Sequence, residues 1–131
     1  MTLSLSSSAF APGTPIPNDF SCRGRNISPT LSWNGAPANT ASFALILDDP
    51  DAPGGTYVHW VVYNIPSTSK GLPQAVAERA TLADGTAQGR NSASHQYYDG
   101  PCPPFGTHRY FFKLFALDAK LLDLPSGATA S

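Results

Sequence analysis

Acidic residues and histidines stand in this chain at positions where they could form one polar site. Asp48, Asp49 and Asp51 lie in the segment "DDPDAPGG", directly after the apolar run "SFALIL". His59 lies in the next apolar run, and His108 stands at the start of a third. A carboxylate that accepts the N–H of a histidine fixes its tautomer and favours the protonated ring. These residue types can act as general acid and base, so the segment and the two histidines are candidates for one polar functional site.

Three segments that carry these residues are predicted to be β-strands. Residues 42–48 form a short continuous apolar run, which is typical of a strand buried on both faces. Residues 56–66 and 108–118 are rich in β-branched and aromatic side chains, which strands favour. Residues 31–35 alternate apolar and polar side chains, and residues 1–10 can begin with a further strand.

The alternation of side chains along a strand decides which of them can meet. His59 is expected to share a face with Tyr57 and Val61, and His108 is expected to share one with Tyr110. If these strands neighbour the strand that ends at Asp48, one end of the sheet gathers Asp49, Asp51, His59, His108 and Tyr110. Taken singly, the acidic segment can be only a turn and each histidine only a core residue bonded to a carbonyl. His95 is expected to be a solvated loop residue.

Helix is expected to be scarce. Residues 72–82 can form one or two helical turns, and residues 118–127 can form another short helix. Residues 11–30, with four prolines and two glycines, are expected to form a long ordered loop. We therefore predict a mainly β protein, a β-sandwich or mixed sheet with short peripheral helices, as a single domain over residues 1–131.

The composition argues against some classes of function. The formal net charge is -1 and there is no basic run, so nucleic-acid binding through phosphate neutralisation is not supported. No apolar stretch approaches the roughly 20 residues that a membrane-spanning helix needs. The N-terminal segment lacks the basic and long apolar regions of a signal peptide, so a cytoplasmic location is expected.

The two cysteines, Cys22 and Cys102, show no zinc-type spacing. Cysteine is a frequently buried residue, and disulfides are uncommon in the cytosol. We therefore interpret them as two free, partly buried thiols, and a disulfide between them is the alternative.

Several long motifs resemble those of a known family. The segments "DDPDAP", "HWVVYNIP" and "GPCPPFGTHRYFFKLFALD" are similar to the phosphatidylethanolamine-binding protein family. With "NISPTLSWNGAPANTASFALILDDPDAP", the resemblance is nearest to the bacterial and archaeal branch often called Raf kinase inhibitor-like proteins, and it covers roughly residues 18–127. It implies a β-sandwich with short helices and a small anion pocket at the surface. Relatives usually continue into a C-terminal helix and strand that this chain is expected to lack, and the sheet edge left exposed would favour a homodimer.

The resemblance also implies which residues bind the ligand. A D-P-D-x-P motif and a G-x-H-R-Y motif build the pocket of the family. With the other pocket histidine and the start of a proline-rich wall, they correspond in this chain to Asp49, Asp51, His59, Gly100, Pro101, Gly106, His108 and Tyr110.

Each of these groups is expected to have a distinct role. His59, His108 and Tyr110 are expected to donate to the ligand, and Asp49 or Asp51 is expected to orient a histidine. Arg109 should point to the other face of its strand, where we expect it to form a structural ion pair with an acid of the "DDPD" segment. Anion binding is expected to strengthen as the pH falls through about 6.5, the ordinary pKa of histidine.

These expectations favour a non-enzymatic module that binds phosphate-like anions or phospholipid head groups and could regulate a partner protein such as a kinase. The alternative is a hydrolase or lyase that uses the Asp, His and Tyr groups as acid and base. No serine stands in a G-x-S-x-G context, so acyl transfer has little support. Mixtures of Asp and His suit zinc or non-haem iron, but H-x-x-E-H and similar ligand spacings are absent, so we expect no metal, and we expect no cofactor.

Overall fold

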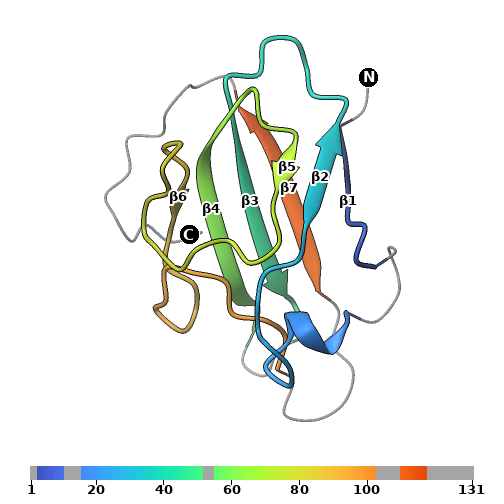
Figure 1. Ribbon diagram of the computed structural model, residues 1–131, viewed down its shortest axis with the longest axis vertical. Helices are drawn as coiled ribbons and strands as arrows, with labels where there is room; N and C mark the ends of the chain where they lie inside the picture. Colours follow the sequence, from blue (N-terminus) through green and yellow to red (C-terminus); the bar gives the residue numbers. More distant parts are fainter. Residues whose placement is uncertain (1–2, 11–15, 52–54, 103–109, 118–131) are drawn as a thin grey trace.

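The computed structural model describes residues 3–10, 16–51, 55–102 and 110–117. β-Strands dominate this part of the chain, and the helix found within it is a short 3₁₀ turn, η1 (Asn18–Phe20). The strands form two antiparallel sheets that lie against each other (Figure 1). The mainly β fold predicted from the sequence is therefore confirmed.

The two sheets differ in size and in the length of their strands. The smaller sheet contains, in spatial order, β1 (Ser4–Ser6), β2 (Leu31–Asn34) and β5 (Gly71–Leu72). The larger sheet contains, in spatial order, β6 (Ala87–Gln88), β4 (Tyr57–Pro66), β3 (Ser42–Asp49) and β7 (Phe111–Leu117). The three strands expected to carry the polar residues are thus neighbours, with β3 between β4 and β7.

The core lies between the two sheets. Trp33 of β2 packs against Phe43 of β3 with their ring centroids 5.3 Å apart. The buried side chains of this core are Leu31, Trp33, Phe43, Leu45, Leu47, Trp60, Val62, Ile65, Leu72 and Tyr98. Burial of a large apolar side chain contributes about 1.5–3 kcal/mol, so this cluster fixes the sandwich and the ends of its strands.

The helix predicted over residues 72–82 is absent, and that prediction was wrong. Ala75 has a φ of 59°, which a right-handed helix does not allow. The N–H groups of Ala75 and Val76 donate to the main-chain and side-chain oxygens of Ser28, each at 2.9 Å. The side chain of Gln88 donates to the carbonyls of Ala77 and Arg79, each at 2.8 Å. Contacts with distant residues therefore replace the helical hydrogen bonds.

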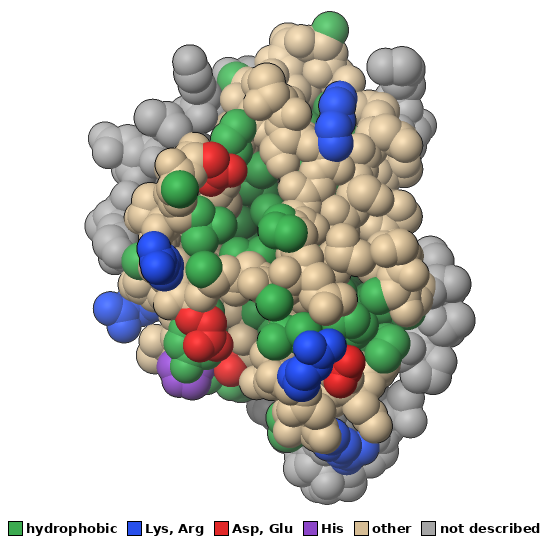
Figure 2. All heavy atoms as spheres, in the orientation of Figure 1, with side chains coloured by type: hydrophobic (Ala, Val, Ile, Leu, Met, Phe, Trp, Pro, Cys, Tyr) green, Lys and Arg blue, Asp and Glu red, His purple; other side chains and the backbone are tan. Residues whose placement is uncertain are grey.

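Figure 2 shows how the charged side chains of the described residues are distributed over one face of the molecule. On the face drawn in Figure 2, the basic side chains of the described residues are spread out rather than joined in one band. Within the described part of the chain, no helix is long and apolar enough to cross a membrane. The short helix expected over residues 118–127 lies outside the described residues.

Candidate functional site

The acidic segment begins while β3 is still paired. Asp48 is opposite Val58 of β4, and Asp49, the last residue of β3, is opposite Tyr57. Asp49 is 2% exposed, and one of its carboxylate oxygens accepts the N–H of Asp51 at 2.8 Å. This is an Asx turn, in which a side chain stabilises the turn that follows the strand. The segment is therefore a turn, and it also holds a buried carboxylate at the end of the sheet.

The side chain of Asp48 lies on the outer face of the larger sheet, away from the core. Its carboxylate accepts a hydrogen bond from Lys113 Nζ at 2.8 Å, and the two side chains are 9% and 50% exposed. The ion pair joins β3 to β7 on the outer face of the larger sheet. Lys113, which interrupts an apolar strand, thus has a partner on the neighbouring strand.

A β-bulge sets the direction of His59. Leu47 is opposite Trp60 while the next residue, Asp48, is opposite Val58, so His59 is an extra residue without a partner on β3. A bulge turns the side chains that follow it relative to those before it. Trp60 therefore enters the core, and the ring of His59 lies against the ring of Tyr57 with centroids 4.9 Å apart.

The bulge also corrects one sequence prediction. His59 was expected to share a face with Val61, but Val61 and Tyr63 belong to a separate cluster with Ala87 on the other face of β4. Tyr57 remains with His59, as expected. The alternation fails across this bulge, and it fails again at a second register shift, where Ile65 pairs with Phe43 but Val62 pairs with Leu45.

The ring of His59 is held by the loop that precedes Gly100. Its Nδ1 lies 2.8 Å from the main-chain oxygen of Asp99. A carbonyl oxygen only accepts, so Nδ1 carries the hydrogen and the neutral ring offers Nε2 as an acceptor. A main-chain carbonyl thus makes the orienting contact for which the sequence predicted a carboxylate. His59 is 6% exposed, and its ring meets that of Tyr110 edge to face at 5.5 Å.

The electrostatics keep His59 neutral and Tyr110 protonated at neutral pH. Burial lowers the pKa of His59, and the opposing effects of the Asp99 carbonyl and of the Asp49, Asp99 and Asp48 charges do not cancel it. Burial raises the pKa of Tyr110 to about 12, with a further contribution from Asp49. Among the described residues, the site therefore contains the acceptor nitrogen of His59 and the phenolic hydroxyl of Tyr110, near the buried carboxylate of Asp49.

The loop before Gly100 is fastened to the turn around η1. The hydroxyl of Tyr98 donates to the Phe20 carbonyl at 2.6 Å, and the N–H of Gly100 donates to the side-chain oxygen of Asn26 at 2.7 Å. The N–H of Cys22 donates to the Pro101 carbonyl at 3.1 Å. Gly100 is required here, since a Cβ would lie 2.1 Å from the Phe20 oxygen. We call residues 18–26 the tethered loop.

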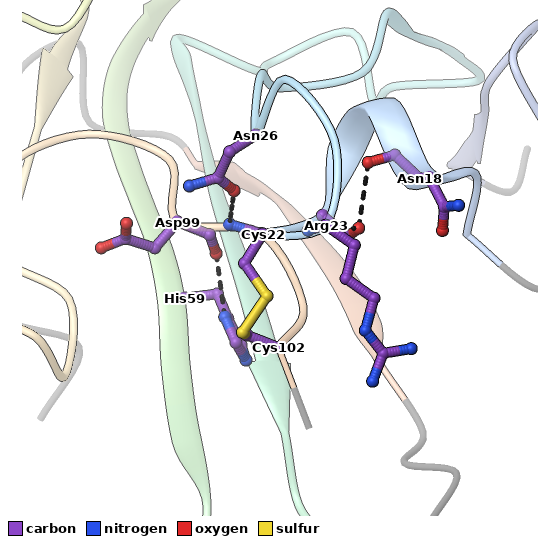
Figure 3. Close-up of a disulfide and its surroundings, with 9 residues drawn as sticks. Asn18, Cys22, Arg23, Asn26, His59, Asp99 and Cys102 are labelled. Atoms are coloured by element: carbon purple, nitrogen blue, oxygen red, sulfur yellow. Dashed lines mark hydrogen bonds between the residues drawn. A yellow bond between two sulfur atoms is a disulfide. The ribbon is translucent and has the colours of Figure 1, made fainter. Parts of the chain in front are cut away.

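A disulfide completes this attachment. Cys22 and Cys102 are bonded, with Cα atoms 5.4 Å apart and a separation of 80 positions in sequence. Figure 3 shows the disulfide joining the tethered loop to the segment whose Asp99 carbonyl holds the ring of His59. The expectation of two free, partly buried thiols was therefore wrong, and both cysteines are exposed. The pair forms because the tethered loop packs directly on residues 98–102, a long-range contact that spacing alone does not reveal.

The comparisons with known proteins agree with this architecture. Residues 6–131 match the family described as phosphatidylethanolamine-binding protein. This chain belongs to the phosphatidylethanolamine-binding protein family. A UPF0098 protein of Methanothermobacter thermautotrophicus is 50% identical over 127 residues, which cover 97% of this chain and 83% of that protein.

Two solved structures of the family are similar to the fold described above. Escherichia coli YbcL, described as a member of the mammalian PEBP family, has a TM-score of 0.89 and 36% identity, covering 98% of this chain and 84% of that one. The PEBP homologue CT736 of Chlamydia trachomatis has a TM-score of 0.88 and 38% identity, covering 98% and 82%.

The described residues include most of the site expected from the family. Asp49, His59 and Tyr110 influence one another, and Gly100 and Pro101 lie in the loop that holds His59. Gly106, His108 and Arg109 lie outside the described residues, so their predicted roles are not tested. Among the described residues, no group of three or more His, Cys, Asp or Glu side chains is arranged to hold a metal ion.

Sequence reasoning missed two participants on the far side of His59. Asn91 donates through Nδ2 to the His59 carbonyl at 2.9 Å and to the Asp99 carboxylate at 2.9 Å. The same carboxylate pairs with Nδ1 of His95 at 2.6 Å, and the His95 ring stacks on Tyr97. His95 is exposed, as expected, but it has a partner. Only the "YYDG" turn signal before the prolines could have drawn attention to Asp99.

Proposed function

We propose that this end of the sandwich is a non-catalytic binding site for phosphate-type anions, either free or as phospholipid head groups. The observation that carries the proposal is the paired placement of His59 and Tyr110, with ring centroids 5.5 Å apart beside the buried Asp49. Their protonation states are fixed by burial rather than left to the solvent. Membership of a family named for phosphatidylethanolamine binding supports the same ligand class.

The hydrogen-bonding pattern favours a singly protonated phosphate or phosphate monoester. Such a ligand carries both an O–H donor and negatively charged acceptor oxygens. Neutral His59 accepts the ligand O–H at Nε2, and the phenol of Tyr110 donates to a ligand oxygen. Below its pKa, His59 becomes a donor instead and adds a positive charge. Because burial lowers that pKa, the strengthening of binding on acidification is expected below pH 6.5 rather than at it.

Isothermal titration calorimetry with inorganic phosphate and with O-phosphoethanolamine tests this proposal. Binding to the native chain and at least tenfold weaker binding to His59→Ala are the expected results. Tyr110→Phe keeps the ring and removes only the hydroxyl. Weaker binding by this variant is therefore not explained by a general loss of structure. An incubation with p-nitrophenyl phosphate addresses the enzymatic alternative, and we expect no hydrolysis above that of a His59→Ala control. Unchanged affinity in both variants would locate the ligand elsewhere.

We also propose that the protein works in an oxidising compartment. Disulfides persist in such compartments and are rare in the cytosol, so the Cys22–Cys102 bond argues against the cytoplasmic expectation. A Mycobacterium tuberculosis relative with 47% identity is named as a candidate lipoprotein, LppC, which supports the same direction. Fractionation of cells that express the native gene, followed by thiol labelling of each fraction, would decide the location.

A further inference from the structure

The proposed anion site raises a question of charge. Asp48, Asp49 and Asp99 all act on His59, and burial keeps that ring neutral near pH 7. Asp49 and Asp51 both act on the hydroxyl of Tyr110. Bringing an anion into a partly buried region with these carboxylates is unfavourable unless a cation is near. The positive charges that act on Tyr110 therefore bear directly on anion binding, and among the described residues Arg23 is one of them.

Arg23 is in the right position to supply that charge. It directly follows Cys22 in the tethered loop, and Figure 3 shows its side chain extending over the first part of β7, where Tyr110 precedes Phe111. Its guanidinium lowers the pKa of Tyr110 and so opposes the two aspartates. The cation and the carboxylates therefore act on the same phenol.

The guanidinium of Arg23 is not committed to an ion pair within the described residues. The ion pairs found there are Arg25–Asp19, His95–Asp99 and Lys113–Asp48. Arg25 makes the useful contrast, because it lies two positions further along the same exposed loop and already holds the Asp19 carboxylate at 2.9 Å. One arginine of the tethered loop is thus paired with a carboxylate, and the charge of the other acts on Tyr110.

The attachments of the tethered loop hold the main chain beside Arg23 in place. Cys22 is held by its disulfide to Cys102 and by the hydrogen bond from its N–H to the Pro101 carbonyl. Residues 98–102 in turn hold His59 through the Asp99 carbonyl. The same short segment therefore positions both the neutral imidazole and the loop that carries the cation, so the distance between them does not depend on a flexible connection.

We propose that Arg23 is an anion-contacting cation of this site and that the Cys22–Cys102 disulfide holds its loop there. The inference rests on the proposed anion-binding function and deepens it. A guanidinium presents parallel N–H groups that match two oxygens of a phosphate or carboxylate, so the ligand class is an oxyanion with at least two accessible oxygens. Arginine side chains are not deprotonated in proteins, so a guanidinium contact does not require a charged His59, and we expect binding to persist at neutral pH.

Titration of inorganic phosphate into four oxidised chains tests the assignment of Arg23. We expect Arg23→Gln to weaken binding about tenfold and Arg23→Lys to weaken it less, since a lysine keeps the charge and loses the paired donors. Arg25→Gln is the matched control and should change the affinity by less than about twofold, because its charge is already paired. In the native chain the Arg23 Nε–H resonance, assigned by its loss in Arg23→Gln, should shift on addition of phosphate.

Reduction of the disulfide tests the second half of the proposal. We expect the reduced native chain to bind phosphate several-fold more weakly, with its fold verified by circular dichroism in the same buffer. In Arg23→Gln, reduction should have little further effect, because the tether acts through Arg23. A Cys22→Ser/Cys102→Ser chain without reductant should reproduce the behaviour of the reduced chain.

The possible failures can be told apart. If Arg23→Gln and Arg25→Gln bind phosphate equally well while Tyr110→Phe loses affinity, the role of Arg23 is overturned and the anion site stands. If reduction weakens Arg23→Gln as much as the native chain, the tether does not act through Arg23. If the native chain does not bind phosphate at all, the proposed function fails, and the role of Arg23 fails with it.

Discussion

His59 and Asp99 hold each other through both their main chains and the imidazole ring. The N–H of Asp99 donates to the His59 carbonyl at 3.2 Å, and Nδ1 of His59 donates to the Asp99 carbonyl at 2.8 Å. Asn91 reinforces the pair by bonding the His59 carbonyl through its Nδ2. The bulged residue of β4 is thus fixed from the side of the loop, where β3 provides no partner. The position and charge state of the ring are therefore properties of the fold.

The stability of the protein should depend on the protonation of His59. Burial lowers its pKa from 6.5 in the folded state, so the unfolded chain takes up a proton at a higher pH than the folded chain does. The stabilising contribution of the neutral ring is present above pH 6.5 and is lost as the pH falls below it, towards the folded-state pKa. Urea unfolding at pH 7.5, 6.5 and 5.5 should show this decline.

A His59→Asn variant is the control for this decline. Asparagine does not titrate, so its free energy of unfolding should fall less between pH 6.5 and 5.5 than that of the native chain. His95 is present in both chains and cancels in the comparison. Parallel profiles would show that His59 is not the group responsible.

The sheets could be predicted from sequence because their signals are local. Residues 42–48 and 56–66 carry continuous apolar runs, and the corresponding strands β3 and β4 differ from the prediction by one residue at most at each end. β7 begins at Phe111, and residues 108–109, where the prediction began, are outside the described part of the chain. Convergence of acids and histidine at one end follows from the antiparallel order of these strands.

The part of the site formed by the tethered loop and residues 98–102 could not be predicted, because it depends on contacts between distant segments. The bulge at His59 has no signal in "YVHWVV". Because of this bulge, the side chain of Trp60 rather than that of Val61 enters the core between the two sheets. The disulfide joins positions 80 residues apart. Arg23 enters the proposal as an anion contact only because this bond and the Asn26–Gly100 hydrogen bond bring its loop to the site.

Removal of the Tyr110 hydroxyl should weaken phosphate binding without changing its pH dependence near neutrality. Burial, followed by the charge of Asp49, raises the pKa of Tyr110 to about 12, so the hydroxyl remains a donor throughout the neutral range. A hydrogen bond to a charged group is worth about 1.5–3 kcal/mol, which corresponds to at least tenfold weaker binding in Tyr110→Phe. Calorimetry at pH 7, 8 and 9 should give the same ratio of affinities each time. A ratio that falls towards one by pH 9 would mean that the hydroxyl ionises far below the expected value.

Loss of the Cys22–Cys102 bond should destabilise the folded chain. The bond closes a loop across 80 positions, and disulfides that close loops of this size contribute about 2–4 kcal/mol. Urea unfolding of Cys22→Ser/Cys102→Ser should show a loss of this order relative to the oxidised native chain. Alkylation of the denatured native chain without reductant should modify neither cysteine. Modification of both under those conditions would contradict the disulfide itself.

Substitution of Gly100 should disrupt both the attachment of the tethered loop and the anion site. A Cβ at this position would lie 2.1 Å from the Phe20 carbonyl oxygen and 2.8 Å from the Ser21 Cα, and these main-chain atoms cannot move without displacing the loop. We expect Gly100→Ala to cost about 2 kcal/mol or more in the free energy of unfolding, because overpacking against backbone is poorly relieved. Phosphate binding should weaken as well, since the loop carries Arg23.

Gly85→Ala is the matched control for this substitution. Gly85 has a φ of 93° and nothing within 4 Å of an added Cβ, so an alanine there is strained by its backbone conformation alone. We expect a cost of about 1 kcal/mol and unchanged phosphate affinity, since Gly85 lies away from the tethered loop. Equal losses of stability in the two variants would show that the close contact at Gly100 is relieved by a local shift. Unchanged phosphate binding by a folded Gly100→Ala chain would show that the tethered loop does not contribute to ligand binding.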